Sequence, residues 1–260
     1  MIIRKSAAEI DKMAAAGDIL VKTLDLVEGR IRPGVTTQEL DETAERFIRS
    51  QGAIPTFKGY RGFPGSICAS ANSMVVHGIP GSQKLAKGDL ISVDVGVTLD
   101  GWVADAARTF PVGEITEEAQ RLLDVTEASL HAGVEACQLG SRIGDVANAV
   151  QTVVEDNGFS VVRSLVGHGV GRSLHEPPEV PNHGTPGQGP KLEEGMVIAI
   201  EPMVAIGSPG IRVDDDEWSV YTVDGSLAAH FEFTVAITAN GPRVLTPWNA
   251  TAAPVGKGSN

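Results

Sequence analysis

Residues 90–112 read LISVDVGVTLDGWVADAARTFPV, which is two apolar runs joined by the dipeptide Asp100-Gly101. Because Asp-Gly strongly favours a two-residue type I′ turn, the segment predicts an antiparallel hairpin. In that register Asp94 and Asp105 lie on one face as diagonal neighbours, roughly 7–8 Å apart at the backbone. Burying a carboxylate among apolar residues is costly unless a cation offsets its charge. The pair therefore predicts a metal site, with a bulged strand and a solvent-facing Asp105 as the alternative.

Helices are expected on both sides of this hairpin. Capping residues and apolar spacing place four of them at about residues 6–29, 36–52, 116–140 and 143–158. Further β-rich runs are expected at residues 196–204, 218–223 and 231–237. Helices and strands are therefore grouped rather than alternating, which is typical of an α+β fold.

The second pair of helices repeats landmarks of the first pair. Gly34 and Gly52 have counterparts in Gly140 and Gly158 at a single offset of 106 residues. We interpret the offset as an internal duplication, with coincidence among small and apolar residues as the alternative. Two α-α-β halves with pseudo-twofold symmetry would leave a ligand cleft between them.

This organisation predicts one catalytic domain. It is expected to span residues 1–248, with halves of about 6–112 and 113–245, followed by a flexible tail at 249–260.

Composition limits the partners and the compartment. With 33 acidic and 21 basic residues, the formal net charge is −12, so nucleic acid and anionic membranes are not expected as partners. Cys68 and Cys137 form no C-x-x-C pair, and no apolar segment has the length of a signal peptide core or a membrane span. A cytoplasmic monomer is the expected state.

Three later segments also place a polar residue in an apolar or glycine-rich setting. His168 lies between Gly167 and Gly169, Glu201 ends an apolar run, and Glu232 lies between Phe231 and Phe233. Each residue alone would more often be a structural group than a ligand. Together with Asp94 and Asp105, however, they form a set of four carboxylates and one imidazole. Such a hard, oxygen-rich set suits a pair of divalent cations rather than a thiolate zinc site.

In their order and spacing these motifs resemble the type I methionine aminopeptidases. The matching segments are Asn72–Pro80, Asp94 with Asp105, Gly167–Pro177, Glu201–Met203 and Phe231–Phe233. The resemblance runs from the first helix to about Leu245. It implies the pitta-bread fold, in which two pseudo-symmetric α-α-β halves surround a central antiparallel sheet.

The resemblance also implies a dinuclear site. Asp94 and Asp105 would hold one divalent ion, Asp105 and Glu232 would bridge, and His168 and Glu201 would hold the other. Cobalt, manganese, iron, nickel or zinc would each suit these ligands.

Catalytic roles are implied for three residues. Glu201 would accept the proton of the attacking water, His77 would hydrogen-bond at the scissile amide, and His175 would steady the carbonyl or the developing oxyanion. His131 and His183 match no motif and are expected at the surface, whereas His230 shares a face with Glu232 and is given no role.

A methionine pocket is implied as well. Besides His77 and His175, its expected substrate-binding residues are Phe57, Tyr60, Phe63, Cys68 and Trp218. Phe57 and Leu174 stand where some bacterial members carry cysteine and phenylalanine. These departures change the expected shape of the pocket rather than the reaction.

The implied function is removal of the initiator methionine from nascent proteins, with a preference for a small second residue and possible transient association with the ribosome. A proline-specific aminopeptidase or prolidase is the nearest rival, disfavoured because only 76 residues precede His77. The short segment between His168 and Glu201 also resembles type I rather than type II enzymes. An inactive binding protein on the same fold is disfavoured because all five ligands are present and the net charge is −12.

Overall fold

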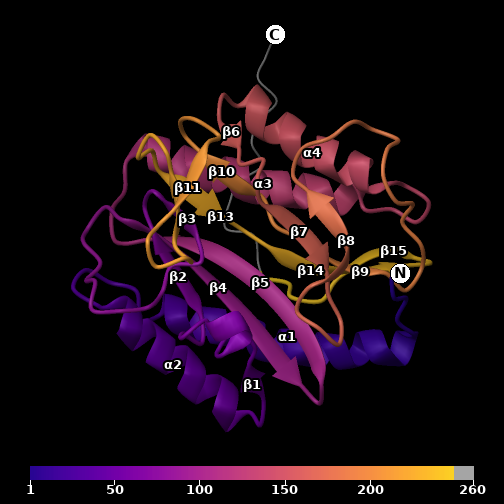
Figure 1. Cartoon of the computed structure of the whole chain (residues 1–260), viewed down its shortest axis with the longest axis horizontal. Coiled ribbons are helices and arrows are strands. Elements are labelled where there is room, and N and C mark those ends of the chain that lie inside the picture. The colour runs from indigo at the N-terminus through magenta and orange to yellow at the C-terminus, as the bar shows by residue number, and fades with distance from the viewer. Residues whose placement is uncertain (249–260) are drawn as a thin grey trace.

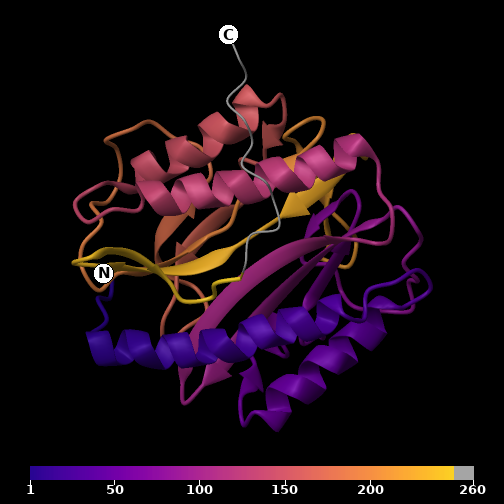
Figure 2. The ribbon, with the colours of Figure 1, turned by 180° about the vertical axis from the view of Figure 1, so that it is seen from behind.

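A computed structural model of the chain describes residues 1–248. Its helices are α1 (Ala7–Glu28), α2 (Thr37–Ser50), α3 (Glu117–Ala136) and α4 (Ile143–Asp156), with a 3₁₀ turn at Tyr60–Gly62. All four α-helices lie on one side of the strands, with α1 and α2 behind one half and α3 and α4 behind the other (Figures 1 and 2). The predicted tail at 249–260 lies outside the described residues.

Within residues 1–248 the strands form four antiparallel sheets. In the first half they are β1 (Ile54–Pro55), β2 (Cys68–Ala71), β3 (Met74–Val76), β4 (Leu90–Leu99) and β5 (Trp102–Pro111). In the second half they are β6 (Ser160–Val161), β7 (Val166–Gly169), β8 (Glu176–Pro181), β9 (Val197–Ile200), β10 (Met203–Ala205), β11 (Ile211–Val213), β12 (Val220–Thr222), β13 (Ala228–His230), β14 (Phe233–Thr238) and β15 (Gly241–Val244). The sheet orders are β1-β4-β2 with β5 beside β4, β13-β10-β6, β11-β12-β3 and β15-β14-β9-β7-β8.

The helix starts follow from their caps, as predicted. Thr36 precedes α2, and its side chain accepts a hydrogen bond from the Glu39 amide while the Glu39 carboxylate accepts one from the Thr36 amide. At α1 the Glu9 carboxylate likewise accepts a hydrogen bond from the Ser6 amide at 2.8 Å, but the Ser6 side chain makes no cap bond. These bonds satisfy amides that a helix start leaves without intrahelical partners.

The hairpin of β4 and β5 has the predicted register. Asp94 pairs with Ala107 and Asp105 pairs with Gly96. Asp100 and Gly101 have φ values of 51° and 75°, the left-handed conformation that a type I′ turn needs at both central positions. The bulged alternative is therefore wrong, and both aspartates lie on one face.

Two predicted strands differ in the structure: one is divided and the other begins later. The run 196–204 was expected to be one strand, but it forms β9 and β10 in different sheets, with Glu201 and Pro202 between them. Proline has no amide to donate to a ladder, which explains why the strand ends there. The run 231–237 likewise begins its strand only at Phe233. Both glutamates of the candidate site thus lie at junctions between strands.

A hydrogen bond of Gly34 recurs at Gly140, 106 residues later, with acceptors that are 107 residues apart. The Gly34 amide donates to the Leu85 carbonyl, and the Gly140 amide donates to the Leu192 carbonyl. Both glycines have positive φ, 91° and 92° respectively. The recurrence supports two similar halves, and the boundary between them at residues 112 and 113 stays a prediction.

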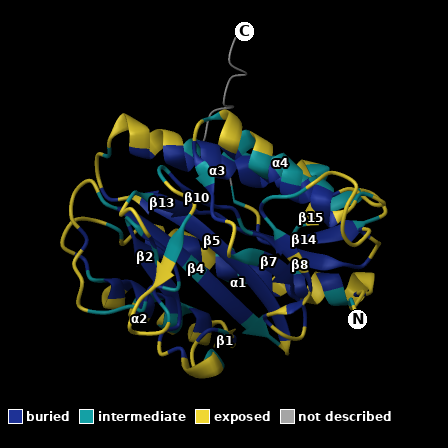
Figure 3. Cartoon of the chain, turned by 45° about the horizontal axis from the view of Figure 1, so that its top comes forward, coloured by how far each residue is buried: buried dark blue, intermediate teal, exposed yellow. Residues whose placement is uncertain are grey.

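Each half has its own hydrophobic core. Leu20, Leu24 and Ile91 are fully buried in the first half, and Leu130 and Val150 in the second. Figure 3 shows that the strands are mostly buried, whereas the exposed residues lie on the outer faces of the helices and on the loops. A third cluster, which includes Phe57, Phe63, Trp102, Val170 and Val197, draws on both halves. Two of its members, Phe57 and Phe63, line the cavity described below. No helix within residues 1–248 is long and apolar enough to cross a lipid bilayer.

Candidate metal centre

The five predicted ligands line one cavity of about 190 Å³. Asp94 comes from β4, Asp105 from β5, His168 from β7, and the two glutamates from the strand junctions. The Nε2 atom of His168 lies 3.7 Å from Asp105 Oδ2 and 3.6 Å from Glu201 Oε1. Asp105, His168 and Glu232 each offer a ligand atom within 4.8 Å of the others. Residues from five separate segments thus converge on a volume suited to small cations.

Burial makes these carboxylates hard to ionise by themselves. It raises the pKa of Asp94 to about 7. It also raises the pKa values of Asp105, Glu201 and Glu232 well above their usual range, and neighbouring carboxylates add to the effect. The same burial lowers the pKa of His168 to about 4, so that its imidazole is neutral at pH 7. A neutral imidazole is the form that binds a metal ion.

Several of the oxygens have no hydrogen-bond partner among the described residues. Oδ1 of Asp94, Oδ1 of Asp105 and Oε1 of Glu232 are buried and unpaired. Buried polar atoms are nearly always satisfied, so orphaned oxygens facing one another need an explanation. Divalent cations supply it, because they pair with the oxygens and reverse the electrostatic cost of gathering the carboxylates. The residues therefore fit a divalent metal site.

Backbone packing holds the ligands in place. A side chain at Gly167 would collide with the Ala199 carbonyl, and one at Gly169 would collide with Pro177. The two glycines thus let β7 pack closely against its neighbours and carry His168 into the centre. On the opposite wall, the Glu232 amide donates to the Ala107 carbonyl at 2.9 Å. This bond ties the Glu232 junction to β5, the strand of Asp105.

Two predicted catalytic histidines also line the cavity. Burial lowers the pKa of His77 to about 4, and its ring makes an edge contact with Trp218 at 6.4 Å between centroids. His175 places its ring 4.2 Å from that of His168, and its Nδ1 lies 2.8 Å from the Tyr60 hydroxyl. Desolvation, followed by the charge of Arg61, lowers the pKa of His175. Both rings are therefore neutral at pH 7.

The predicted pocket residues line the remaining walls. They are Phe57, Tyr60, Phe63, Cys68 and Trp218. Phe63 and Trp218 meet edge to face at 5.0 Å between ring centroids. Burial raises the pKa of the Cys68 thiol well above its usual range, which makes the group an apolar part of the wall. The cavity thus has an apolar end and a carboxylate end.

Some residues of the site were missed or misplaced by sequence reasoning. Arg61 lines the cavity although no motif indicated it; its position between Tyr60 and Gly62 in a tight turn was the available signal. The sequence indicates only that His230 shares a strand face with Glu232, and it predicts no role for this residue. It is 2% exposed, and its Nε2 lies 3.7 Å from Glu201 Oε2 and 4.0 Å from Glu232 Oε2.

His131 and His183 are predicted at the surface, but neither is fully exposed in the structure. Both are half-buried. The Nε2 atom of His131 is buried without a hydrogen-bond partner among residues 1–248, and its ring packs on Phe233 at 5.6 Å. Its position on the inward side of α3, against a strand of the other layer, explains the burial.

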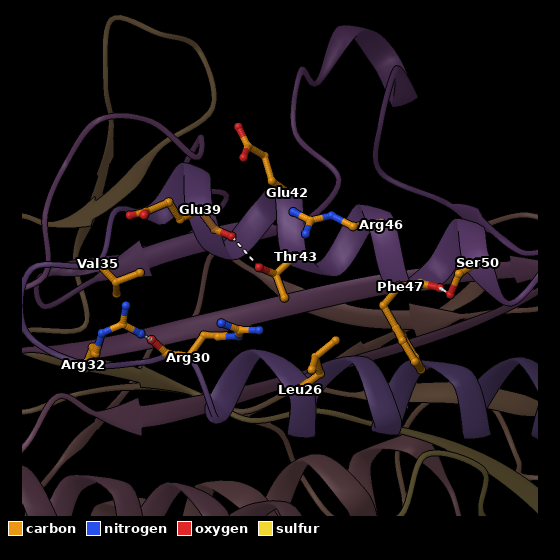
Figure 4. Close-up of a pocket in the computed structure, with 10 residues that line it drawn as sticks. All are labelled: Leu26, Arg30, Arg32, Val35, Glu39, Glu42, Thr43, Arg46, Phe47 and Ser50. Carbon is orange, nitrogen blue, oxygen red and sulfur yellow. Dashed lines mark hydrogen bonds between the residues drawn. The ribbon is translucent and has the colours of Figure 1, made fainter.

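A larger hollow of about 560 Å³ lies elsewhere, between α1 and α2. Figure 4 shows Leu26 of α1 and Phe47 of α2 turned toward the space between the helices, with Arg30 and Arg46 at its sides. Its lining contains none of the candidate site residues. The smaller cavity, rather than the larger one, gathers the groups that can do chemistry.

A buried cluster of this composition suits a divalent metal ion, and comparison with known sequences gives the class of protein. Residues 11–239 match the profile of metallopeptidase family M24. The chain belongs to this family of metal-dependent peptidases.

The most informative relatives are methionine aminopeptidases. The one from Clostridium perfringens is 56% identical over 246 residues, covering 95% of this chain and 99% of the relative. Methionine aminopeptidase 1 of Bacillus subtilis is 52% identical over the same length, again covering 95% and 99%. Within family M24 the chain is therefore placed among the methionine aminopeptidases, which are metallo-exopeptidases.

Solved structures agree on the fold. The crystal structure of methionine aminopeptidase from Rickettsia prowazekii matches with a TM-score of 0.94 at 40% identity, covering 95% of this chain and 100% of that chain. Prolidase from Pyrococcus furiosus matches with a TM-score of 0.78 at 23% identity, covering 95% of this chain and 66% of that one, which shows a shared fold alone. The predicted pitta-bread fold is confirmed.

Proposed function

We propose that the protein removes N-terminal methionine from nascent polypeptides in the cytoplasm, with a preference for a small second residue. One observation carries the proposal: a single cavity of about 190 Å³ joins an aromatic, apolar end to the cluster of metal-ligating carboxylates. The identity of more than 50% to methionine aminopeptidases over nearly the whole chain supports the same substrate.

The apolar end suits a methionine side chain. Phe57 and Phe63 are 6% and 3% exposed, and Trp218 closes against Phe63. Thioether sulfur makes favourable contacts with aromatic rings, of about 0.3–1.5 kcal/mol each. A volume this small accommodates one side chain beside the reacting groups rather than an extended peptide. This supports cleavage after the terminal residue.

The carboxylate end is proposed to hold two divalent ions, of cobalt, manganese, iron, nickel or zinc. Asp94, Asp105, His168, Glu201 and Glu232 would be the ligands. When bound, such a pair polarises the scissile carbonyl and lowers the pKa of a water molecule. Two ions are proposed because four carboxylates exceed the charge that one divalent ion offsets.

Glu201 and two histidines would handle protons and orientation. Glu201 is the candidate base, since its oxygens face the centre and its pKa is already raised by burial. Nδ1 of His175 lies 2.8 Å from the Tyr60 hydroxyl, and we assign the hydroxyl as the donor, which leaves the proton of the neutral ring on Nε2. That proton can be donated to the carbonyl or the developing oxyanion. His77, which lines the same cavity, would hydrogen-bond at the scissile amide.

The test is hydrolysis of three peptides, Met-Gly-Met-Met, a Met-Lys peptide and an Ala-Pro peptide, by chelator-stripped protein with each divalent metal restored singly. Metal-dependent release of methionine from the first peptide alone is expected. Cleavage of the Ala-Pro peptide would indicate the proline-specific branch instead, and no cleavage with any metal would indicate an inactive binding protein.

The partners are proposed from the same chemistry. Nascent N-termini are available only briefly, so the protein would act near the ribosome exit, through transient association and as a monomer. Co-sedimentation with ribosomes carrying nascent chains, and the mass of the free protein by light scattering, test the two statements.

A further inference from the structure

A buried ion pair lies behind the wall of the site that carries His175. The Nζ atom of Lys5 donates to Glu176 Oε2 at 2.8 Å, and the two side chains are 2% and 5% exposed. Burying two charges costs several kcal/mol per ion, so a buried pair of this kind adds little net stability over apolar residues of similar size. Its function therefore has to be sought in what it positions.

The carboxylate of Glu176 closes the turn that carries His175. Its Oε1 atom accepts hydrogen bonds from the amides of Arg172 at 2.8 Å and Ser173 at 3.2 Å. His175 lies between these amides and Glu176 along the chain. Glu176 also begins β8, where it pairs across the ladder with Gly169, the residue after His168. His168 and His175 are thus each one residue away from the positions that Glu176 fixes through its hydrogen bonds and its ladder pairing.

Lys5 is itself fixed by the surrounding backbone. Its amide donates to the Gly195 carbonyl at 2.6 Å, and its Nζ also donates to the Ile3 carbonyl at 3.1 Å. A side chain added at Gly171 would come within 2.5 Å of Lys5 Cε and 2.7 Å of Glu176 Oε1. Because the ammonium has no room to move, it holds Oε2, and Oε1 stays directed at the two amides.

We propose that the Lys5–Glu176 pair is a positioning device for His175: the pair fixes the 172–176 turn so that the His175 imidazole stays aligned with Tyr60 and the scissile carbonyl. The inference rests on the proposed function, in which His175 contacts the substrate. Lys5 and Glu176 touch no reacting atom and act only through the turn.

The test compares two double variants that are both neutral and nearly equal in size. Lys5→Met with Glu176→Gln keeps a carbonyl oxygen for the Arg172 and Ser173 amides, whereas Lys5→Met with Glu176→Met removes it. The Met/Met variant is expected to lower kcat about 10- to 100-fold, as a misplacement near 1 Å does, with KM and bound metal unchanged. The Met/Gln variant keeps the acceptor oxygen without the ammonium that holds it, so it is expected to recover only part of this loss. A wild-type kcat in that variant would mean that Lys5 takes no part in the positioning. Equal kcat values in the two variants would overturn the proposal.

A double-mutant cycle separates positioning from general damage. In a His175→Ala background the Met/Met change is expected to cost no further kcat, because the residue that the turn aligns is gone. A full additional loss would mean that the pair does not act through His175. If the Met/Met protein does not fold, Lys5→Met with Glu176→Leu replaces it in both arms.

Failure of the proposed function would be recognised separately. If the wild type cleaves no methionine peptide, turnover cannot report on the turn, but hydrogen exchange of the Arg172 and Ser173 amides and the NMR shifts of the His175 ring still can. Faster exchange and changed ring shifts in the Met/Met variant alone support the positioning role. Unchanged values in that variant overturn it.

Discussion

At the scale of single residues, the site separates groups that would hold metal from groups that would touch substrate. Glu232 is 2% exposed and has an oxygen with no hydrogen-bond partner among residues 1–248. His77 lines the same cavity with a half-buried ring against Trp218. The unpaired oxygen of Glu232 needs a cation, whereas the His77 ring needs only a bound substrate as its partner.

This difference predicts opposite effects for two substitutions. Glu232→Gln is expected to lower both bound metal and activity by at least about 100-fold, because it removes a charged ligand. His77→Ala is expected to lower kcat by about 10²–10⁴-fold with the metal content unchanged. Metal per protein, measured by atomic emission, and peptide hydrolysis at saturating metal distinguish the two.

Glu118→Gln is the matched control, since Glu118 is exposed in the first turn of α3 and makes the same chemical change away from the site. Near-normal activity of Glu232→Gln at limiting metal would contradict the ligand assignment. Loss of metal from the His77→Ala protein would make His77 a ligand.

At the scale of elements, local signals predicted well and contacts distant in the sequence did not. The register of β4 and β5 followed from Asp100-Gly101, because a two-residue turn leaves a single pairing. The starts of α1 and α2 followed from Ser6 and Thr36, because a cap residue and the glutamate three positions after it mark a helix start within a few residues of sequence.

The division of residues 196–204 could not be predicted from periodicity, because β9 and β10 pair with strands of different sheets. Likewise, no local sequence pattern indicates that Lys5 forms an ion pair with Glu176, which is 171 positions away. The ligand types of the site were predictable as an unusual set of polar residues in apolar runs. Their convergence depends on packing between the halves.

The loop between β12 and β13 offers a test at this scale. The carboxylate of Asp224 accepts bonds from the Ser208 amide at 2.6 Å and from the Ser226 hydroxyl and amide. These bonds, the one from Ser208 first, lower the pKa of Asp224 from 3.8 to about 2. Since the folded pKa lies below the unfolded one, the stabilisation is complete above about pH 4 and is lost as pH falls through 2.

Asp224→Asn is therefore expected to lower Tm at pH 6 and to have a progressively smaller effect between pH 4 and pH 2. Thermal unfolding of both proteins across this range measures the difference. Asp215→Asn, on an exposed residue, serves as the control for removing one surface charge. A Tm difference that does not change with pH would contradict the assigned role of the carboxylate.

At the scale of the whole molecule, the halves are joined by side-chain hydroxyls at the site itself. Thr234 of β14 accepts a hydrogen bond from the Asp105 amide at 3.0 Å and donates one to the Asp105 carbonyl at 2.7 Å. Thr109 of β5 makes the equivalent pair with the amide and carbonyl of His230. The two threonines thus replace ladder hydrogen bonds where β5 meets the second half.

This junction predicts that stability and metal binding are coupled through one buried hydroxyl. Thr234→Val keeps the shape but leaves the buried amide and carbonyl of Asp105 without that partner, at a cost of about 1–3 kcal/mol. For a domain of this size a loss of 1 kcal/mol lowers Tm by roughly 2–4 °C. Metal affinity is expected to fall as well, because Asp105 would no longer be held from the second half.

Thr234→Ser restores the hydroxyl and should recover metal affinity even where some stability is lost with the methyl group. Thr238→Val removes a hydroxyl that donates to the Gly241 carbonyl and accepts from the Asn240 amide, both within the β14–β15 hairpin. It should lower Tm without changing metal affinity. Calorimetric unfolding and titration of the chelator-stripped proteins with manganese measure both quantities. If Thr234→Val lowers Tm but leaves the affinity unchanged, the halves hold each other together without aligning the ligands. Asp105 would then owe its position to the β4–β5 hairpin alone.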